Sequence, residues 1–181
     1  MIRTIGHSNH PIGRFVELLA AAGVRLLVDV RSTPYSRRFP QFGRERLTRH
    51  LAEAGIEYAW EGTALGGKPG GGGSYDALAA RPEFTDALDR LIARSADTTV
   101  CLMCAEKEPL DCHRTLLVAR RLAERGAEVG HLLADGGIRS HRAVEETLLA
   151  GNAAPDLFDD RPTRLARAYA ARERVLKRPG T

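Results

Sequence analysis

Along most of this 181-residue chain, segments with the apolar pattern of β-strands alternate with segments that have the pattern of helices. Residues 24–30 form a nearly continuous apolar run, which is typical of a strand buried on both faces. Before it, Phe15, Leu18 and Leu19 recur at the spacing of one helix face. The alternation indicates an α/β fold. We expect a single domain with a mostly parallel sheet and helices on both faces, in Rossmann-like layers.

Glycine and proline residues separate these patterns and place the expected elements. Strands are expected at 2–5, 24–30, 56–60, 98–104 and 129–133. Helices are expected at 11–22, 44–54, 82–94, 112–125 and 139–149, and a loop at 61–75. We expect an α/β domain over residues 1–150, a linker over 151–160 and a basic C-terminal helix or tail over 161–181.

Basic residues are unevenly distributed along the chain. It has 27 Lys and Arg against 23 Asp and Glu, a net charge of +4. Residues 161–181 hold seven basic residues and one acidic residue, so they contribute +6 and leave −2 for residues 1–160. The basic isoelectric point therefore belongs to the C-terminal segment. One alternative we keep is a nucleic-acid-binding or DNA-repair-associated module that uses this tail.

Composition also narrows the expected location. Three cysteines cannot form a fully paired disulfide framework, which favours a reducing compartment and a cytoplasmic protein. No apolar stretch approaches the ~18–20 residues of a membrane span, and the first residues lack the apolar core of a secretory signal. We therefore expect no membrane partner.

Polar side chains collect where the expected strands end. They are His7 and Ser8 after the first strand, Asp29, Arg31 and Ser32 at the end of the second, and Cys104 and Glu106 at the end of the fourth. Ligands of open α/β sheets bind beyond the carboxyl ends of the strands. The pattern therefore predicts a functional site at this edge of the sheet.

The segment after Cys104 adds a reactive group of residues. Asp111 is placed to cap a helix, with Cys112, His113 and Arg114 in its first turn. The free N–H groups and the dipole at a helix start attract anions and lower the pKa of a thiol. The segment therefore predicts an anion site beside an activated cysteine.

Together these residues predict an enzyme or a ligand-binding domain for an anionic substrate, a nucleotide or a phosphorylated metabolite; whether the chain is an enzyme stays open. Arg31, Arg114 and the helix start at Cys112 would hold the anion. The candidate catalytic residues are Asp29, Glu106 and His113 for acid–base chemistry and Cys112 as nucleophile. The candidate substrate-binding residues are His7, Ser8, Arg31, Ser32, Cys104 and Arg114.

A Cys/His metal-binding domain is a further alternative. Cys104, Cys112 and His113 would need another ligand, for example His7. Cys101 and Cys104 face opposite sides of a strand, and neighbouring helical residues such as Cys112 and His113 splay by ~100°. We therefore assign no metal ligand and expect no cofactor. Simple packing of the cysteines in the core also stays open.

Asp29 has two interpretations. A carboxylate at the end of a buried strand is costly unless it is paired or hydrogen-bonded. An ion pair with Arg31 or Arg114 that organises the loops is one interpretation. A general base or a group that orients the ligand is the other.

Four segments, in this order, resemble a known family. They are Thr4-Ile5-Gly6-His7-Ser8, then Asp29-Val30-Arg31-Ser32 with Pro34 and Ser36, then Leu65-Gly66-Gly67, and finally Cys104-Ala105-Glu106-Lys107 with Cys112-His113-Arg114. The chain resembles the family called domain of unknown function 488 (DUF488) over residues 2 to about 135. The resemblance implies a small α/β domain of prokaryotic type and implies no particular reaction.

Overall fold

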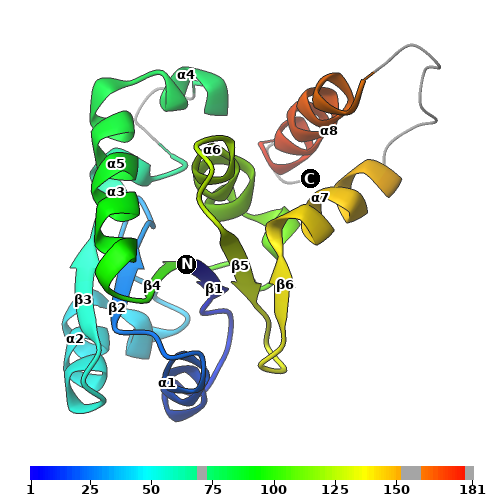
Figure 1. Cartoon of the computed structure of the whole chain (residues 1–181). Coiled ribbons are helices and arrows are strands. Elements are labelled where there is room, and N and C mark those ends of the chain that lie inside the picture. The colour runs from blue at the N-terminus through cyan, green and yellow to red at the C-terminus, as the bar shows by residue number, and fades with distance from the viewer. Residues whose placement is uncertain (69–72, 152–159, 178–181) are drawn as a thin grey trace.

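The first strand of the chain lies in the interior of the sheet. The computed structural model describes residues 1–68, 73–151 and 160–177, which form one six-stranded sheet (Figure 1). In spatial order its strands are β3 (Glu57–Trp60), β2 (Leu26–Asp29), β4 (Val100–Cys104), β1 (Ile2–Gly6), β5 (Val129–Leu132) and β6 (Ile138–Ser140). All neighbours are parallel except β5 and β6. The predicted α/β class and mostly parallel sheet are confirmed.

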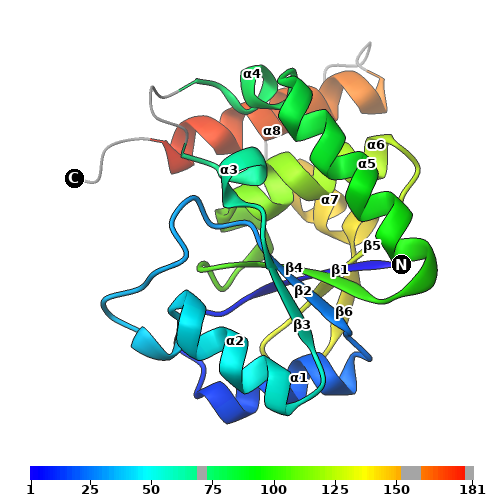
Figure 2. The same ribbon diagram turned by 90° about the vertical axis from the view of Figure 1, so that its left-hand side faces the viewer.

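Helices cover both faces of this sheet (Figure 2). One face carries α1 (Ile12–Ala21) and α2 (Arg44–Glu53). The other face carries α5 (Pro82–Asp97), α6 (Arg120–Glu124), α7 (His141–Ala150) and α8 (Arg161–Leu176). Two separate apolar cores lie between the sheet and these layers.

The buried strand β4 divides its side chains between the two cores. Cys101 and Met103 pack in the core of α1 and α2, whereas Leu102 and Cys104 pack in the core of α5 and α6. Successive side chains of a strand point to opposite faces, which gives this division. Only Cys104 of the two strand cysteines therefore reaches the layer in which Cys112 lies.

The structure corrects the helix expected at 112–125. A 3₁₀ turn, η2 (Pro109–Asp111), comes first, Cys112 is extended, and a π-helical turn, η3 (Arg114–Ala119), leads into α6. All six residues of η3 are buried. A segment that is buried on all sides shows no helical stripe, so periodicity does not separate a π-turn from an α-helix.

Short elements occupy positions where other structures were expected. α3 (Gly62–Leu65) lies inside the expected loop 61–75, and α4 (Tyr75–Ala79) begins at its last residue. β6 includes the first two residues of the helix expected at 139–149, and α7 starts only after Ser140 caps it. Elements of about three to five residues contain too few positions for a hydrophobic period to specify them.

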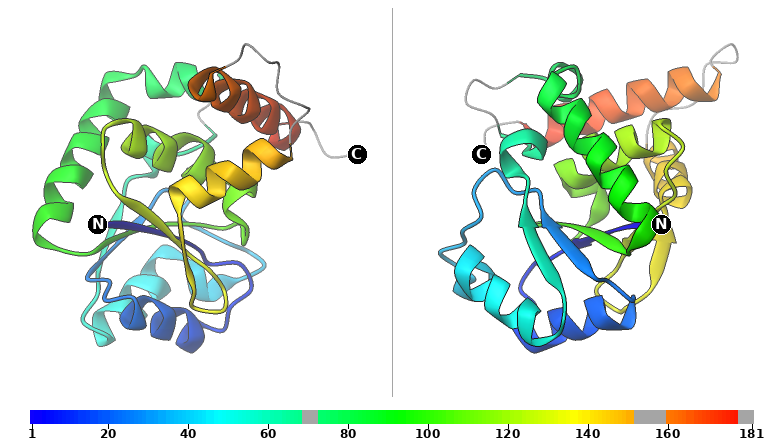
Figure 3. Two further views of the ribbon diagram at one scale, coloured as in Figure 1. Left: turned by 45° about the vertical axis from the view of Figure 1, so that its right-hand side comes forward. Right: turned by 60° about the vertical axis from the view of Figure 1, so that its left-hand side comes forward.

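The C-terminal helix α8 packs beside α7 (Figure 3). Tyr169 of α8 is buried, with its hydroxyl 3.1 Å from Nε2 of His141 and donating to Glu145 at 3.2 Å. Except at its two ends, the expected linker 151–160 lies outside the described residues, as do 178–181 of the tail. None of the described helices has the length and apolar character needed to cross a bilayer.

Candidate functional site

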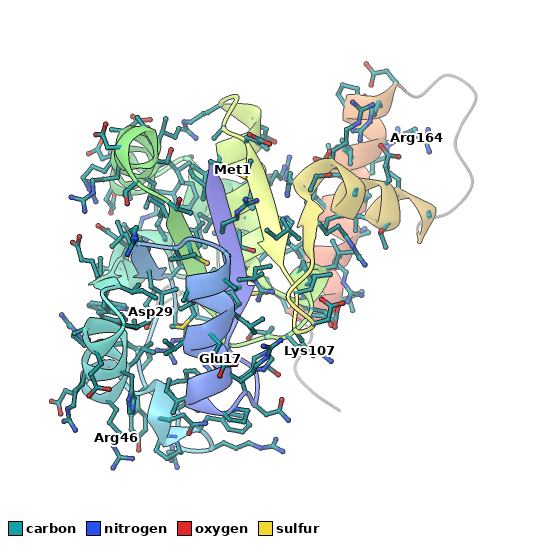
Figure 4. The ribbon with its side chains drawn as sticks, turned by 60° about the horizontal axis from the view of Figure 1, so that its bottom comes forward. Met1, Glu17, Asp29, Arg46, Lys107 and Arg164 are labelled. Carbon is teal, nitrogen blue, oxygen red and sulfur yellow. The ribbon has the colours of Figure 1, made fainter. Side chains whose placement is uncertain are left out.

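Three strand ends meet at the carboxyl edge of the sheet. After β1, the N–H of His7 donates to the Cys104 carbonyl at 2.8 Å, and that of Ser8 to the Ala105 carbonyl at 2.9 Å. After β2, the N–H of Val30 donates to the Met103 carbonyl at 3.0 Å. Asp29 and Lys107 are labelled at this edge in Figure 4. The parallel pairing brings the predicted site residues together, and they form two adjoining groups.

The first group, here called the Cys/His cluster, consists of Cys104, Cys112 and His113. The two Sγ atoms and Nδ1 of His113 all lie within 4.8 Å of one another. Nδ1 is 3.5 Å from the Cys104 sulfur and 3.8 Å from the Cys112 sulfur. The Glu106 Oε2 lies 3.0 Å from each sulfur. Two sulfurs, an imidazole nitrogen and a carboxylate thus converge on one point.

The backbone at Cys112 makes this convergence possible. Cys112 is extended, with φ −140° and ψ 140°, and helical geometry begins at His113, with φ −60° and ψ −26°. The expectation that Asp111 caps a helix with Cys112 in its first turn is therefore wrong. Asp111 lies in η2 and forms an ion pair with Arg172 of α8. Because Cys112 is not helical, the expected ~100° splay does not separate it from His113.

The orientation of the His113 ring is fixed from two sides. Its Nε2 donates to the main-chain oxygen of Val30 at 2.9 Å, which leaves Nδ1 facing the sulfurs. Gly67 packs against the ring so closely that a Cβ there would lie 2.5 Å from Cγ of His113. Gly67 of the Leu65-Gly66-Gly67 segment must therefore be glycine for the His113 ring to lie where it does.

The two thiols and the Glu106 carboxylate lie close enough to shift one another's pKa values. The hydrogen bond between Cys104 and Cys112, together with burial, raises the pKa of Cys104 well above the usual range. Burial also raises the pKa of Cys112, but the hydrogen bond from Cys104 and the charges of Arg114 and His113 outweigh it, so the pKa of Cys112 is lowered. Burial of the carboxylate and the nearby Cys112 raise the pKa of Glu106. Cys112 is therefore the more acidic thiol of the pair.

Arg114 holds the loop that carries Glu106. Its guanidinium donates to the carbonyls of Glu106 at 2.5 Å and of Lys107 at 3.0 Å, and its backbone N–H donates to the Cys112 sulfur at 3.4 Å. The side chain is 1% exposed, and its Nε has no hydrogen-bond partner among the described residues. Arg114 thus holds the loop that carries Glu106 next to the Cys112 sulfur.

The second group centres on the ion pair of Asp29 and Arg31. The guanidinium of Arg31 makes two bonds to the carboxylate, at 2.6 and 2.9 Å, and donates to the Phe42 carbonyl at 2.8 Å. The Tyr58 hydroxyl donates to Asp29 at 2.9 Å. Both charged residues are buried. The carboxylate is fully occupied, as the interpretation of Asp29 as a loop-organising ion pair expects.

His7 belongs to this second group and not to the Cys/His cluster. Its ring stacks on Phe42 with centroids 4.3 Å apart, and its Nε2 accepts from Arg31 at 3.3 Å. Burial lowers the pKa of His7 to about 4, so the ring is neutral. Its Nδ1 also donates to the Ser8 carbonyl at 2.9 Å, so both ring nitrogens are engaged away from the Cys/His cluster and His7 is not placed as the further metal ligand considered from the sequence.

The two predicted serines, Ser8 and Ser32, are half-buried. Ser8 has a φ of 46°, and its hydroxyl donates to the side-chain oxygen of Asn9 at 3.3 Å. The Ser32 hydroxyl accepts from the N–H of Lys68 at 3.0 Å. Their expected role in substrate binding stays a prediction.

Sequence reasoning missed three contributors. The Val30 carbonyl is a backbone group without a sequence signal. Tyr75 is buried in the same apolar core as Cys104 and Cys112. Arg172 of α8 donates to the Leu110 carbonyl at 3.0 Å. Its position in the basic tail had suggested nucleic acid as a partner.

The comparisons with known proteins agree with the sequence segments. The model of the family described as domain of unknown function DUF488 matches residues 11–121, more than half of the chain. The match includes both Asp29 and the Cys/His cluster, whereas His7 and α8 lie outside it. No curated protein and no solved structure gives a significant match. The resemblance seen in the sequence is confirmed, and the chain belongs to the DUF488 family.

Proposed function

We propose that the protein binds a thiophilic divalent metal ion of the zinc class through Cys104, Cys112 and His113. The observation that carries the proposal is the convergence of two sulfurs and Nδ1 within 4.8 Å of one another. Zinc prefers cysteine sulfur and histidine nitrogen as ligands. Ligating histidines usually donate their other N–H to a carbonyl or carboxylate, as His113 does to Val30.

Glu106 bears on whether the proposed metal centre would be structural or catalytic. Three protein ligands leave a fourth position on zinc, which water or substrate occupies in catalytic sites and a protein group occupies in structural ones. Although Glu106 is an exposed residue, its carboxylate reaches both sulfurs at 3.0 Å. It is placed to be the fourth ligand or to accept a proton from a metal-bound water.

The anionic substrate expected from the sequence is compatible with the metal proposal if the anion binds the metal and not the two arginines. The guanidinium of Arg31 already binds protein acceptors through most of its N–H groups, and that of Arg114 donates to two main-chain carbonyls and is 1% exposed. An anion would instead bind at the fourth metal position, beside Glu106. A phosphorylated metabolite or a nucleotide has the oxygen ligands for this position.

Metal analysis of the purified protein tests the proposal. We expect about one zinc ion per chain, and cobalt substitution should give thiolate-to-cobalt charge-transfer absorption with a tetrahedral spectrum. Cys104→Ala, Cys112→Ala and His113→Ala should each lose tight binding. Cys101→Ala, which removes the cysteine on the opposite sheet face, should keep it. Equal binding in all four variants, or no binding in the wild type, would refute the metal centre.

A reactive thiolate is the second candidate, because the pKa of Cys112 is lowered and the Arg114 N–H donates to its sulfur. Its 1% exposure argues against direct attack on a substrate. Alkylation of the chelator-treated protein distinguishes the two candidates. Modification of Cys112 that phosphate or nucleotides block, in a protein that takes up no zinc, would favour the thiolate.

A further inference from the structure

The loop that leaves β2 and the first turn of α2 carry an exposed set of arginines. This arginine patch consists of Arg37, Arg38, Arg44 and Arg46. Residues 34–46 contain these four basic residues and one acidic residue, a net charge of +3 within a segment, 1–160, that sums to −2. The patch is therefore a local concentration of positive charge on an otherwise slightly acidic body.

The patch differs from the basic surface of α5 in having no acidic partners. In residues 1–68, 73–151 and 160–177, none of the four arginines forms an ion pair. On the opposite layer, by contrast, Arg90 pairs with Glu61 at 3.2 Å and Arg94 with Glu57 at 2.8 Å. Unpaired guanidinium groups keep their N–H donors for an external anion.

Aromatic rings alternate with the arginines. Arg38 lies over the Phe39 ring at 5.5 Å, and Arg44 over the Trp60 ring at 5.6 Å. Tyr35 is 62% exposed, the most exposed of the large hydrophobic side chains among the described residues. Planar rings between cations are the composition with which proteins bind unpaired bases and their phosphates.

The loop is held in a defined shape. Arg31 donates to the Phe42 carbonyl at 2.8 Å, and the N–H of Arg44 donates to the Pro34 carbonyl at 3.0 Å. The N–H of Phe39 donates to Ser36 Oγ at 3.1 Å. The arginines and Tyr35 are thus presented by an ordered backbone, which lowers the entropy cost of binding.

We propose that the arginine patch and Tyr35 form a binding surface for single-stranded nucleic acid. The guanidinium groups contact consecutive phosphates, and the Tyr35 ring stacks on a base. A base can stack on a protruding ring only when it is unpaired, which selects a single strand over a duplex. The surface is independent of the metal proposal and distinct from the basic tail. Figure 4 shows Arg46 and Arg164 of α8 on opposite sides of the molecule.

Fluorescence anisotropy with a dye-labelled oligothymidine of about 16 nucleotides tests the proposal. For about four phosphate contacts, log affinity should fall against log salt with a slope of about −3, a loss of about 50-fold between ~50 and ~200 mM salt. Changing all four patch arginines to Gln should abolish measurable binding. Tyr35→Ala should weaken binding at least about fivefold, and Tyr35→Phe should not.

Matched variants control for total charge and for the tail. Changing the ion-paired Arg81, Arg90, Arg94 and Arg125 to Gln removes the same charge from the other layer and should leave binding within about twofold. The double variant Arg164→Gln, Arg174→Gln in α8 should also keep oligothymidine binding within about twofold of the wild type. Four results overturn the proposal: no binding of oligothymidine, an equal loss in the control variant, tighter binding of a duplex of the same length, or equal competition by polyglutamate.

Discussion

His113 donates from Nε2 to the main-chain oxygen of Val30, 2.9 Å away, so a residue after β4 is tied to the strand end of β2. The bond fixes which ring nitrogen faces the sulfurs of Cys104 and Cys112. A side-chain acceptor could rotate away, whereas a strand carbonyl cannot. The orientation of the imidazole in the Cys/His cluster is therefore fixed by the main chain next to the sheet.

Gly67→Ala should displace His113. The new Cβ would lie 2.5 Å from Cγ of the histidine, so the ring or the loop must shift. Overpacking of this kind costs about 1–3 kcal/mol, and we also expect weaker zinc binding. Urea unfolding and zinc titration measure the two effects.

Gly13→Ala is the matched control for Gly67→Ala. Nothing lies within 4 Å of a Cβ at Gly13 of α1, so alanine there should stabilise the protein by up to about 1 kcal/mol through helix propensity. If Gly67→Ala were as stable as Gly13→Ala and bound zinc normally, the packing of Gly67 on His113 would not matter.

Glu106→Gln should lower zinc affinity about 10- to 100-fold if the carboxylate is a ligand or hydrogen-bonds to one. The reason is its 3.0 Å approach to both sulfurs. Glu108→Gln changes an exposed carboxylate of the same loop and should have no effect. A chromogenic chelator competition gives both affinities. Unchanged affinity in Glu106→Gln would mean that Glu106 lies outside the coordination shell.

Stability should fall as the pH is lowered from 6.5 to about 4 through the burial of His7, whose pKa is lowered to about 4. Above this window the histidine is neutral in the folded and unfolded states. Within it only the unfolded chain binds the proton, so unfolding becomes easier, by at most about 3 kcal/mol. The unfolding free energy in urea, measured across this range, should be less pH-dependent in His7→Asn. His50→Asn, on the surface of α2, should follow the wild type.

Asp29→Asn should destabilise the fold strongly. It removes the buried partner of Arg31 and leaves a guanidinium that is 6% exposed without its carboxylate. Breaking a buried pair in this way costs about 3–5 kcal/mol. Asp86→Asn, an exposed carboxylate of α5, serves as control and should change stability by less than about 0.5 kcal/mol. A wild-type melting curve for Asp29→Asn would show that the ion pair does not organise the loops.

The sheet and the position of the site follow from the sequence, because buried parallel strands are recognisable as apolar runs. Cys104, Glu106 and Cys112 were expected at the same edge, and the structure brings them together. The geometry of the Cys/His cluster was not predictable, because it depends on one extended residue, Cys112, inside a segment with helical periodicity. The separation of His7 into the group of Asp29 also required the structure. Only the fold decides which strand-end residue contacts which neighbour.

The order of the strands also affects how the molecule is made. β1 leaves the ribosome early, yet both of its neighbours, β4 and β5, follow much later in the chain. β1 therefore stays unpaired until β4 has been made, and its other edge stays open until β5, which ends at Leu132, follows. Long-range pairings of this kind form slowly and expose strand edges meanwhile. Cys112 and His113 lie between β4 and β5 in the chain, so the Cys/His cluster can close only after β4 has been made.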